Sequence, residues 1–299
     1  MSDPRRAVLL LAHGTPGASE DVPEYLRCVT GGRELPADVV KEITHRYELI
    51  GRSPLTELTL AQGEALAKRL GAPVYVGMRN WQPYIKDAVA KMLADGVQLA
   101  VVLCLAPQNS RTSTGLYRKA VEEAVAGRMR LEVIESWHDH PKLIAAFAAR
   151  LRAVMKPGVP VLFTAHSVPT RTLQADASGA GDPYESQARE TAALVAAKCG
   201  LGEKDWRFAF QSQGMSGGPW IGPTVEETLG ALNIEGHRSV VVQPIGFVCD
   251  HVEVLYDIDI AFKKFAKERG MELTRAESLN VLPEFIEALA EIVEPRLRS

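Results

Sequence analysis

Eight short apolar runs alternate with amphipathic helical patterns along this 299-residue chain. Several of the runs are rich in β-branched residues, which favours strands, whereas the segments between them repeat apolar residues at helical spacing. Strict alternation of strand and helix predicts an α/β fold with parallel sheets covered by helices on both faces. The expected strands span residues 7–12, 74–78, 99–105, 131–135, 159–164, 207–211, 239–243 and 272–275. The expected helices span residues 22–30, 37–47, 55–70, 85–95, 114–126, 142–155, 183–199, 225–232, 252–269 and 284–297.

Two segments of nearly the same sequence follow two of these runs. Residues 12–16 read A-H-G-T-P, and residues 165–169 read A-H-S-V-P. Four expected strands precede the helix at 142–155 and four follow it, so the repeated segment opens each set. We interpret the chain as two related halves, 1–138 and 139–299, and leave open that the last helix packs back on the first half. Generic strand-to-turn chemistry is the alternative explanation of so short a repeat.

The repeat places a histidine at the end of one expected strand in each half. Open α/β sheets bind ligands outside the carboxyl ends of their strands, so His13 and His166 are expected to face one cleft. A histidine is also a good ligand for iron and other borderline metals. The alternative for His13 is a hydrogen bond to the backbone of its own loop.

Composition narrows the classes of partner. The chain is 46% hydrophobic and 24% charged, with a formal net charge of -3, which gives no overall bias toward nucleic acid. Its four cysteines lie far apart without C-x-x-C spacing, so neither a structural zinc nor an iron–sulfur cluster is expected. The N-terminus lacks a signal-peptide pattern, and no apolar window is long enough to span a bilayer. We therefore expect a cytoplasmic protein with reduced thiols.

Acidic residues cluster after the seventh expected strand. Asp250, Glu253 and Asp257 lie at i, i+3 and i+7, which would place three carboxylates on one face of the expected helix. Capping explains the first two, because Asp250 at the N-cap with Glu253 three residues later forms a capping arrangement. The third acid favours a functional row instead, and His166 with Glu253 would make a site that handles metal and protons.

The residues around these positions resemble a known family. Residues 163–169 read F-T-A-H-S-V-P and residues 244–259 read P-I-G-F-V-C-D-H-V-E-V-L-Y-D-I-D, and both resemble motifs of the ferrochelatases. Further matches cover residues 46–55, 77–84, 106–115, 211–212 and 219–223. The resemblance implies two Rossmann-like, chelatase-type domains, each a four-stranded parallel sheet flanked by helices, with a porphyrin cleft between them. It implies insertion of Fe²⁺ into a porphyrin, giving haem or its tetracarboxylate precursor coprohaem.

The resemblance also implies roles for individual residues. His166 and Glu253 would be the catalytic and iron-site residues, with Asp257 as a secondary metal residue. Which of His166 and Glu253 takes the pyrrole proton is left open. The positions implied in porphyrin binding are His13, Arg46, Tyr47, Ser53 and Tyr117, and the apolar walls of the cleft would draw on Met78, Trp81, Tyr84, Leu105 and Trp220.

Three positions depart from the family pattern: His13, Ala261 and Thr30, where the compact bacterial relatives carry an arginine. Compact bacterial relatives often have tyrosine where this chain has His13, and a further acid where it has Ala261. The acidic row is therefore expected to be shorter here. A glycine-rich stretch at 214–218 lacks the order of a dinucleotide fingerprint.

The expected partners are a porphyrin and ferrous iron as substrates and a haem as product, with no resident prosthetic group and no nucleic acid. A monomer is expected, and a peripheral membrane contact is left open. Protoporphyrin IX and coproporphyrin III remain alternative substrates, although the short stretch between Thr30 and Arg46 favours an open cleft that tolerates four carboxylates. The rival functions are a chelatase for another tetrapyrrole, such as sirohydrochlorin, and a haem-binding protein without turnover.

Overall fold

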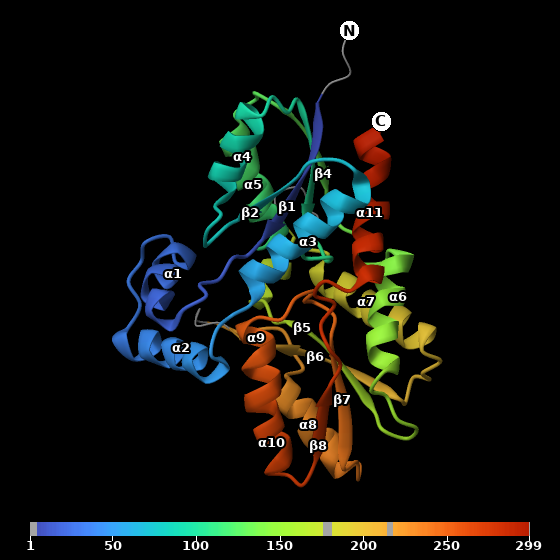
Figure 1. Cartoon of the computed structure of the whole chain (residues 1–299). Coiled ribbons are helices and arrows are strands. Elements are labelled where there is room, and N and C mark those ends of the chain that lie inside the picture. Colours follow the sequence, from blue (N-terminus) through green and yellow to red (C-terminus); the bar gives the residue numbers. More distant parts are fainter. Residues whose placement is uncertain (1–4, 176–180, 214–217, 299) are drawn as a thin grey trace.

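The computed structural model describes residues 5–175, 181–213 and 218–298, and within them eight strands form two parallel sheets (Figure 1). The first sheet has the order β2-β1-β3-β4 and the second the order β6-β5-β7-β8. This confirms the predicted fold class and the equivalence of the two central strands. The strands are β1 (Arg6–Ala12), β2 (Val74–Met78), β3 (Leu99–Cys104), β4 (Arg130–Ile134), β5 (Val161–His166), β6 (Trp206–Gln211), β7 (Ser239–Pro244) and β8 (Glu272–Arg275).

Helices cover both faces of each sheet. Helices α4 and α5 pack on the outer face of the first sheet, and α8 and α10 on the outer face of the second. Helices α3, α6, α7 and α11 fill the space between the sheets. The helices are α1 (Val22–Val29), α2 (Ala37–Ile50), α3 (Leu55–Leu70), α4 (Ile85–Ala94), α5 (Thr114–Val125), α6 (Pro141–Arg152), α7 (Tyr184–Lys198), α8 (Val225–Ile234), α9 (Val252–Leu255), α10 (Lys263–Lys267) and α11 (Pro283–Arg298).

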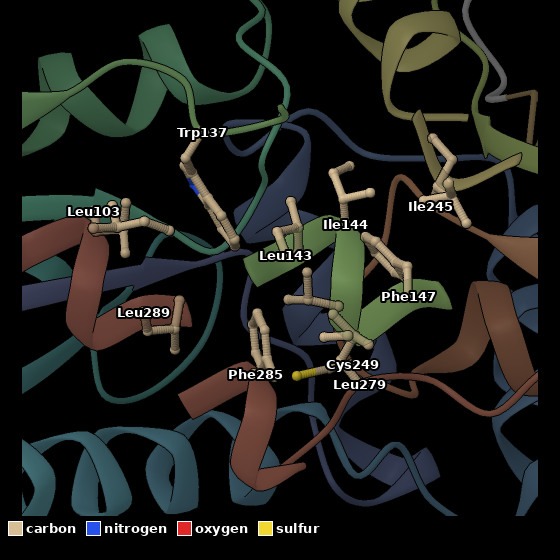
Figure 2. Packing of buried hydrophobic residues seen from close by; sticks show 14 of the residues in the cluster. Leu103, Trp137, Leu143, Ile144, Phe147, Ile245, Cys249, Leu279, Phe285 and Leu289 are labelled. Carbon is tan, nitrogen blue, oxygen red and sulfur yellow. The ribbon is translucent and has the colours of Figure 1, made fainter. Parts of the chain in front are cut away.

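One hydrophobic cluster joins the two halves. It takes side chains from the inner face of each sheet and from the four helices between them. Figure 2 shows Trp137, Phe147 and Phe285 within this cluster, with the rings of Trp137 and Phe285 stacked at a centroid distance of 6.2 Å. Helix α11, the last of the chain, contacts α3, β1 and β3 of the first half as well as α6. The boundary at residue 138 stays a prediction, because this core is continuous across it.

Helices α1 and α2 stand apart from that core and project to one side of the molecule (Figure 1). They pack around a small cluster of their own, which contains Val22, Tyr25, Leu26 and Tyr47. Trp81 and Val252 pack against it from outside. The two helices are therefore held by fewer apolar contacts than the layers of the main body.

The predicted helix over residues 252–269 is helical from Val252 to Lys267, but it is not one regular α-helix. Helix α9 ends at Leu255, and a π-helical segment, Asp257–Phe262, separates it from α10. The Tyr256 carbonyl accepts hydrogen bonds from the N–H groups of Ile260 at 3.1 Å and Ala261 at 2.9 Å. One residue more than in an α-turn is thus accommodated after Tyr256.

The predicted capping role of Asp250 is also wrong. Extended His251 precedes α9, and no side-chain hydrogen bond caps the helix. The Asp250 carboxylate instead accepts hydrogen bonds from Arg275 at 3.1 Å, Ser278 at 2.7 Å and Asn280 at 2.8 Å. Asp250 therefore holds the loop before α9 against β8, and it does not belong to a row with Glu253 and Asp257.

None of the helices in the described ranges combines the length and the apolar character that a bilayer crossing requires. Residues 214–217 of the glycine-rich stretch lie outside the described residues.

Candidate active site

Both histidines of the repeat lie at the carboxyl ends of central strands. His13 follows β1 directly, and His166 is the last residue of β5. Gly14 has a φ of +77°, and a Cβ there would lie 2.7 Å from the Met78 side chain, so only glycine fits after His13. In the second half, a Cβ on Gly246 would lie 3.0 Å from Ala165, because the loop after β7 passes closely over the end of β5. That close approach brings Glu253 to His166.

A cleft of about 330 Å³ lies between the two halves at these strand ends. Its lining is mainly apolar and aromatic, with a few polar groups at the centre, which is typical of ligand sites. Side chains that line it from the first half include His13, Tyr25, Leu105 and Tyr117. Those from the second half include His166, Trp220, Phe247, His251 and Glu253.

The Glu253 carboxylate bridges two histidines. Its Oε1 lies 3.3 Å from Nε2 of His166, and its Oε2 lies 3.4 Å from Nε2 of His251. The backbone of Glu253 is fixed as well, because the Gln211 side chain donates a hydrogen bond of 2.8 Å to its carbonyl. Tyr184 donates a hydrogen bond of 2.8 Å to the carbonyl of His166. His166 is therefore held at the end of β5 and Glu253 in α9, and a side-chain hydrogen bond fixes the backbone carbonyl of each residue.

The pair stabilises opposite charges. Burial alone would lower the pKa of His166, but the Glu253 carboxylate outweighs burial and raises this pKa to about 9. Burial would raise the pKa of Glu253, but His166 and His251 hold it well below its ordinary value. The empty cleft therefore contains an imidazolium paired with a carboxylate, in side chains that are 33% and 35% exposed.

Asp257 lies beyond this pair. Its carboxylate accepts a short hydrogen bond from Ser212 and is 3.9 Å from the Arg46 guanidinium, which also stacks on Tyr256. Burial and the charge of Glu253 raise the pKa of Asp257 to about 6. In the described part of the chain, no group of three or more His, Cys, Asp or Glu side chains is placed to hold a metal ion. A metal role for Asp257 therefore stays a prediction.

The first-half wall carries a different pair. Nε2 of His13 is 2.8 Å from the Tyr25 hydroxyl, and the Asn80 side-chain amide is 3.2 Å from both ring nitrogens of His13. Burial lowers the pKa of His13 to about 4, so its imidazole is neutral where that of His166 is charged. The expected alternative, a hydrogen bond from the His13 ring to loop backbone, is not what the described residues show.

Only some of the other predicted residues line the cleft. Tyr117 and the predicted wall residues Leu105 and Trp220 line it. Arg46, Tyr47, Ser53 and Asp257 do not line it in the described residues. Tyr47 is 1% exposed and packs behind Tyr25, whereas Ser53 is buried against Thr15 through a hydrogen bond of 2.8 Å. Met78, Trp81 and Tyr84 also lie away from the lining.

Several cleft residues were missed by sequence reasoning, among them His251, Phe247, Tyr25 and Tyr184. His251 had a signal, because it lies two residues before Glu253 within the D-H-V-E segment. Tyr25 and Tyr184 sit on helices with no local motif, and only the tertiary fold brings them to the cleft. No feature of the sequence alone pairs Tyr25 with His13.

The fold and the paired groups in the cleft define a two-domain chelatase. Among solved structures, SirB from Bacillus subtilis with Fe3+ has the same fold, with a TM-score of 0.63, 11% identity and coverage of 98% of this chain and 96% of that one. The family model for ferrochelatase matches residues 5–297. The chain belongs to the ferrochelatase family, which confirms the resemblance seen in its motifs.

Two curated relatives place the chain within the family. A ferrochelatase of Acidobacterium capsulatum is 56% identical over 98% of this chain and 95% of its own length. A coproporphyrin III ferrochelatase of a Geobacillus species is 35% identical over the whole of both chains. The similarity therefore covers both halves and the site between them.

Proposed function

We propose that His166 and Glu253 carry the insertion of Fe²⁺ into a porphyrin, the reaction of the ferrochelatase family to which this chain belongs. The observation that supports these roles is their 3.3 Å contact in a cleft walled by both halves. A free porphyrin has two pyrrole N–H protons, and both must leave before four nitrogens can coordinate iron. The cleft therefore has to supply a proton acceptor and a transient site for iron.

The charges of His166 and Glu253 indicate which residue binds iron and which accepts the proton. His166 holds a proton against Glu253, so iron that binds Nε2 of His166 displaces that proton to solvent. Loss of the imidazolium leaves the Glu253 carboxylate free to accept the first pyrrole proton, to release it to solvent, and then to accept and release the second in the same way. His251, which contacts the other carboxylate oxygen, keeps Glu253 oriented through this exchange. We accordingly assign iron to His166 and the proton to Glu253.

The walls bind the macrocycle. Leu105 and Tyr117 offer apolar surface from the first half, and Trp220 and Phe247 offer it from the second. His13 lies on the first-half wall, and we propose that it contacts the iron porphyrin from the face opposite His166. Arg46, beside the cleft rather than in it, would meet a carboxylate at the rim.

We propose a tetracarboxylate porphyrin of the coproporphyrin III type as the substrate. The short connection between α1 and α2 supports this choice, because it leaves the mouth of the cleft without a long apolar lip. The name of the Geobacillus relative supports it as well. We also propose that the enzyme works as a cytoplasmic monomer with no resident prosthetic group; sedimentation, cell fractionation and the absorption spectrum of the purified protein test these points.

The deciding experiment is His166→Ala, assayed for Fe²⁺ and Zn²⁺ insertion into coproporphyrin III and protoporphyrin IX. We expect a loss of activity of about 100-fold or more, since the variant lacks the iron ligand, while circular dichroism stays that of the native fold. The matched control is His237→Ala, which removes a histidine paired with Glu235 outside the cleft.

Each other result has a definite meaning. Turnover at the native rate by His166→Ala would refute the assigned roles. A native enzyme that metallates only sirohydrochlorin would be the rival chelatase, and one that binds haem without any insertion would be the haem-binding protein. A higher kcat/KM for protoporphyrin IX than for coproporphyrin III would refute the proposed substrate.

A further inference from the structure

The contact between Tyr25 and His13 is not used in the mechanism above. The Tyr25 hydroxyl lies 2.8 Å from Nε2 of His13, and both side chains line the cleft. Tyr25 is 8% exposed and comes from α1, while His13 comes from the end of β1. A polar contact between two cleft residues from separate elements points to a role at the cleft itself.

Both partners are held independently of any ligand. The backbone of His13 is fixed because its carbonyl accepts a hydrogen bond of 2.9 Å from the N–H of Asn80. The Tyr25 ring is held by an edge contact with Trp81 and a tilted contact with Tyr47, each at a centroid distance of 6.4 Å. The hydrogen bond is therefore a built feature of the empty cleft.

One ring nitrogen of His13 serves both partners. Nε2 contacts the Tyr25 hydroxyl whichever nitrogen carries the proton: with the proton on Nδ1 its lone pair accepts from the hydroxyl, and with the proton on Nε2 it donates to the hydroxyl while the Asn80 amide donates to Nδ1. An iron porphyrin held against the first-half wall would bind the Nε2 lone pair, which requires the proton on Nδ1 and loss of the contact with the hydroxyl. The tyrosine hydroxyl and the iron therefore compete for this nitrogen.

We propose that Tyr25 is a positioning residue that competes with iron for Nε2 of His13 and thereby weakens the retention of the iron porphyrin product. This inference rests on the proposed function, because it concerns the product of that reaction. A neutral histidine nitrogen is a strong ligand for iron. The competing hydroxyl offsets that strength, so the product leaves the cleft faster than it would from an unpaired histidine.

The test uses Tyr25→Phe and preformed iron coproporphyrin III, so it requires no turnover. The variant keeps the ring and its packing and removes only the hydroxyl. Loss of one hydrogen bond should slow dissociation of the iron porphyrin about two- to tenfold, measured by transfer to excess apomyoglobin. The Soret band should also shift toward that of a more strongly histidine-ligated iron.

The controls separate this competition from general damage. In a His13→Ala background, Tyr25→Phe should change neither the dissociation rate nor the spectrum. Tyr75→Phe removes a tyrosine hydroxyl bonded to Asp95 outside the cleft and should behave as the native protein. Native dissociation and spectrum in Tyr25→Phe, or a native spectrum in His13→Ala, would overturn the inference.

These outcomes differ from a failure of the proposed function. If His166→Ala retained full insertion activity, the catalytic assignment would fail while the dissociation and spectral measurements still reported on His13 and Tyr25. If Tyr25→Phe dissociated at the native rate, the competition would be refuted while insertion by the native enzyme stood.

Discussion

Glu253 is the residue on which the charges of the cleft depend. Its two carboxylate oxygens contact two different histidines, at 3.3 and 3.4 Å. Because an opposite charge favours the ionised form of each partner, the carboxylate keeps His166 protonated in the empty site. Entry of Fe²⁺ at His166 is therefore coupled to release of a proton.

Glu253→Gln should remove that coupling. Burial is the largest influence on His166, so without the carboxylate its pKa should fall from about 9 to near or below the ordinary 6.5. NMR titration of the histidine Hε1 resonances measures the change, with Glu235→Gln beside His237 as the control. A His166 resonance that still titrates near pH 9 in Glu253→Gln would contradict this account.

The same shift fixes the sign of the stability effect. The folded-state pKa of His166 lies above its unfolded value, so the stabilisation is fully present below about pH 6.5 and is lost as the pH rises toward 9. Glu253, with its pKa lowered on folding, contributes above its unfolded pKa and loses that contribution in acid.

Single residues were predictable where a motif carried them. His166 and Glu253 were named from sequence, and the structure places them in contact. The positions of Tyr47 and Ser53 behind the cleft wall were not predictable, because depth from a surface depends on packing against distant residues such as Tyr25 and Thr15. The local sequence does not indicate how deeply a side chain is buried behind the cleft wall.

At the scale of elements, the segment after β7 differs most from expectation. Periodicity alone cannot separate an α-helix from an α-helix with one π turn, because the buried residues Val254, Ile258, Phe262 and Ala266 recur every four residues, a spacing that a regular α-helix also shows. The loop before α9 and the π segment after it are tied to the same residue outside the helix. Arg275 of β8 donates to Asp250 on one side and to Asp259 on the other, at 3.1 and 2.8 Å.

Asp250→Ala should therefore destabilise the start of α9. It removes an acceptor shared by Arg275, Ser278 and Asn280, and leaves the Arg275 guanidinium, in a side chain only 12% exposed, with Asp259 as its remaining acidic partner. We expect the free energy of unfolding to fall by about 2–4 kcal/mol in urea titrations. Glu123→Ala, which removes an acid 68% exposed beside Lys119, should cost less than about 0.5 kcal/mol. Equal losses in the two variants would show that Asp250 is only a surface charge.

At the scale of the whole molecule, the alternation of strands and helices was enough to predict two parallel sheets. The repeated A-H-x-x-P segment also predicted correctly that the halves place their histidines at equivalent strand ends. Packing of the last helix on the first half was left open from the sequence, but one core continuous through both halves was not predicted, because the contacts of α11 with α3 and α6 join residues far apart in the chain.

A shared core implies that the halves unfold together. Phe285→Ala removes a fully buried ring stacked on Trp137, and should lower the free energy of unfolding by about 3–5 kcal/mol. Tryptophan fluorescence and far-ultraviolet circular dichroism should still report one coincident transition in urea. Ile234→Ala, at a side chain that is 89% exposed, should change stability by less than about 0.5 kcal/mol. Two resolved transitions would contradict a single cooperative unit.

The joined core also sets the mechanics of the cleft. Packed interiors are nearly incompressible, so moving the two sheets apart would break contacts throughout the cluster around Phe147 and Phe285. The part of the gap between the strand ends is thus a slot of nearly fixed width, whereas the part lined by Tyr25 of α1 rests on helices held by their own small cluster. Such a slot selects ligands by their thickness. A flat ring enters edgewise beside α1 and α2, and a ring that bends inside the slot does so against closely packed walls.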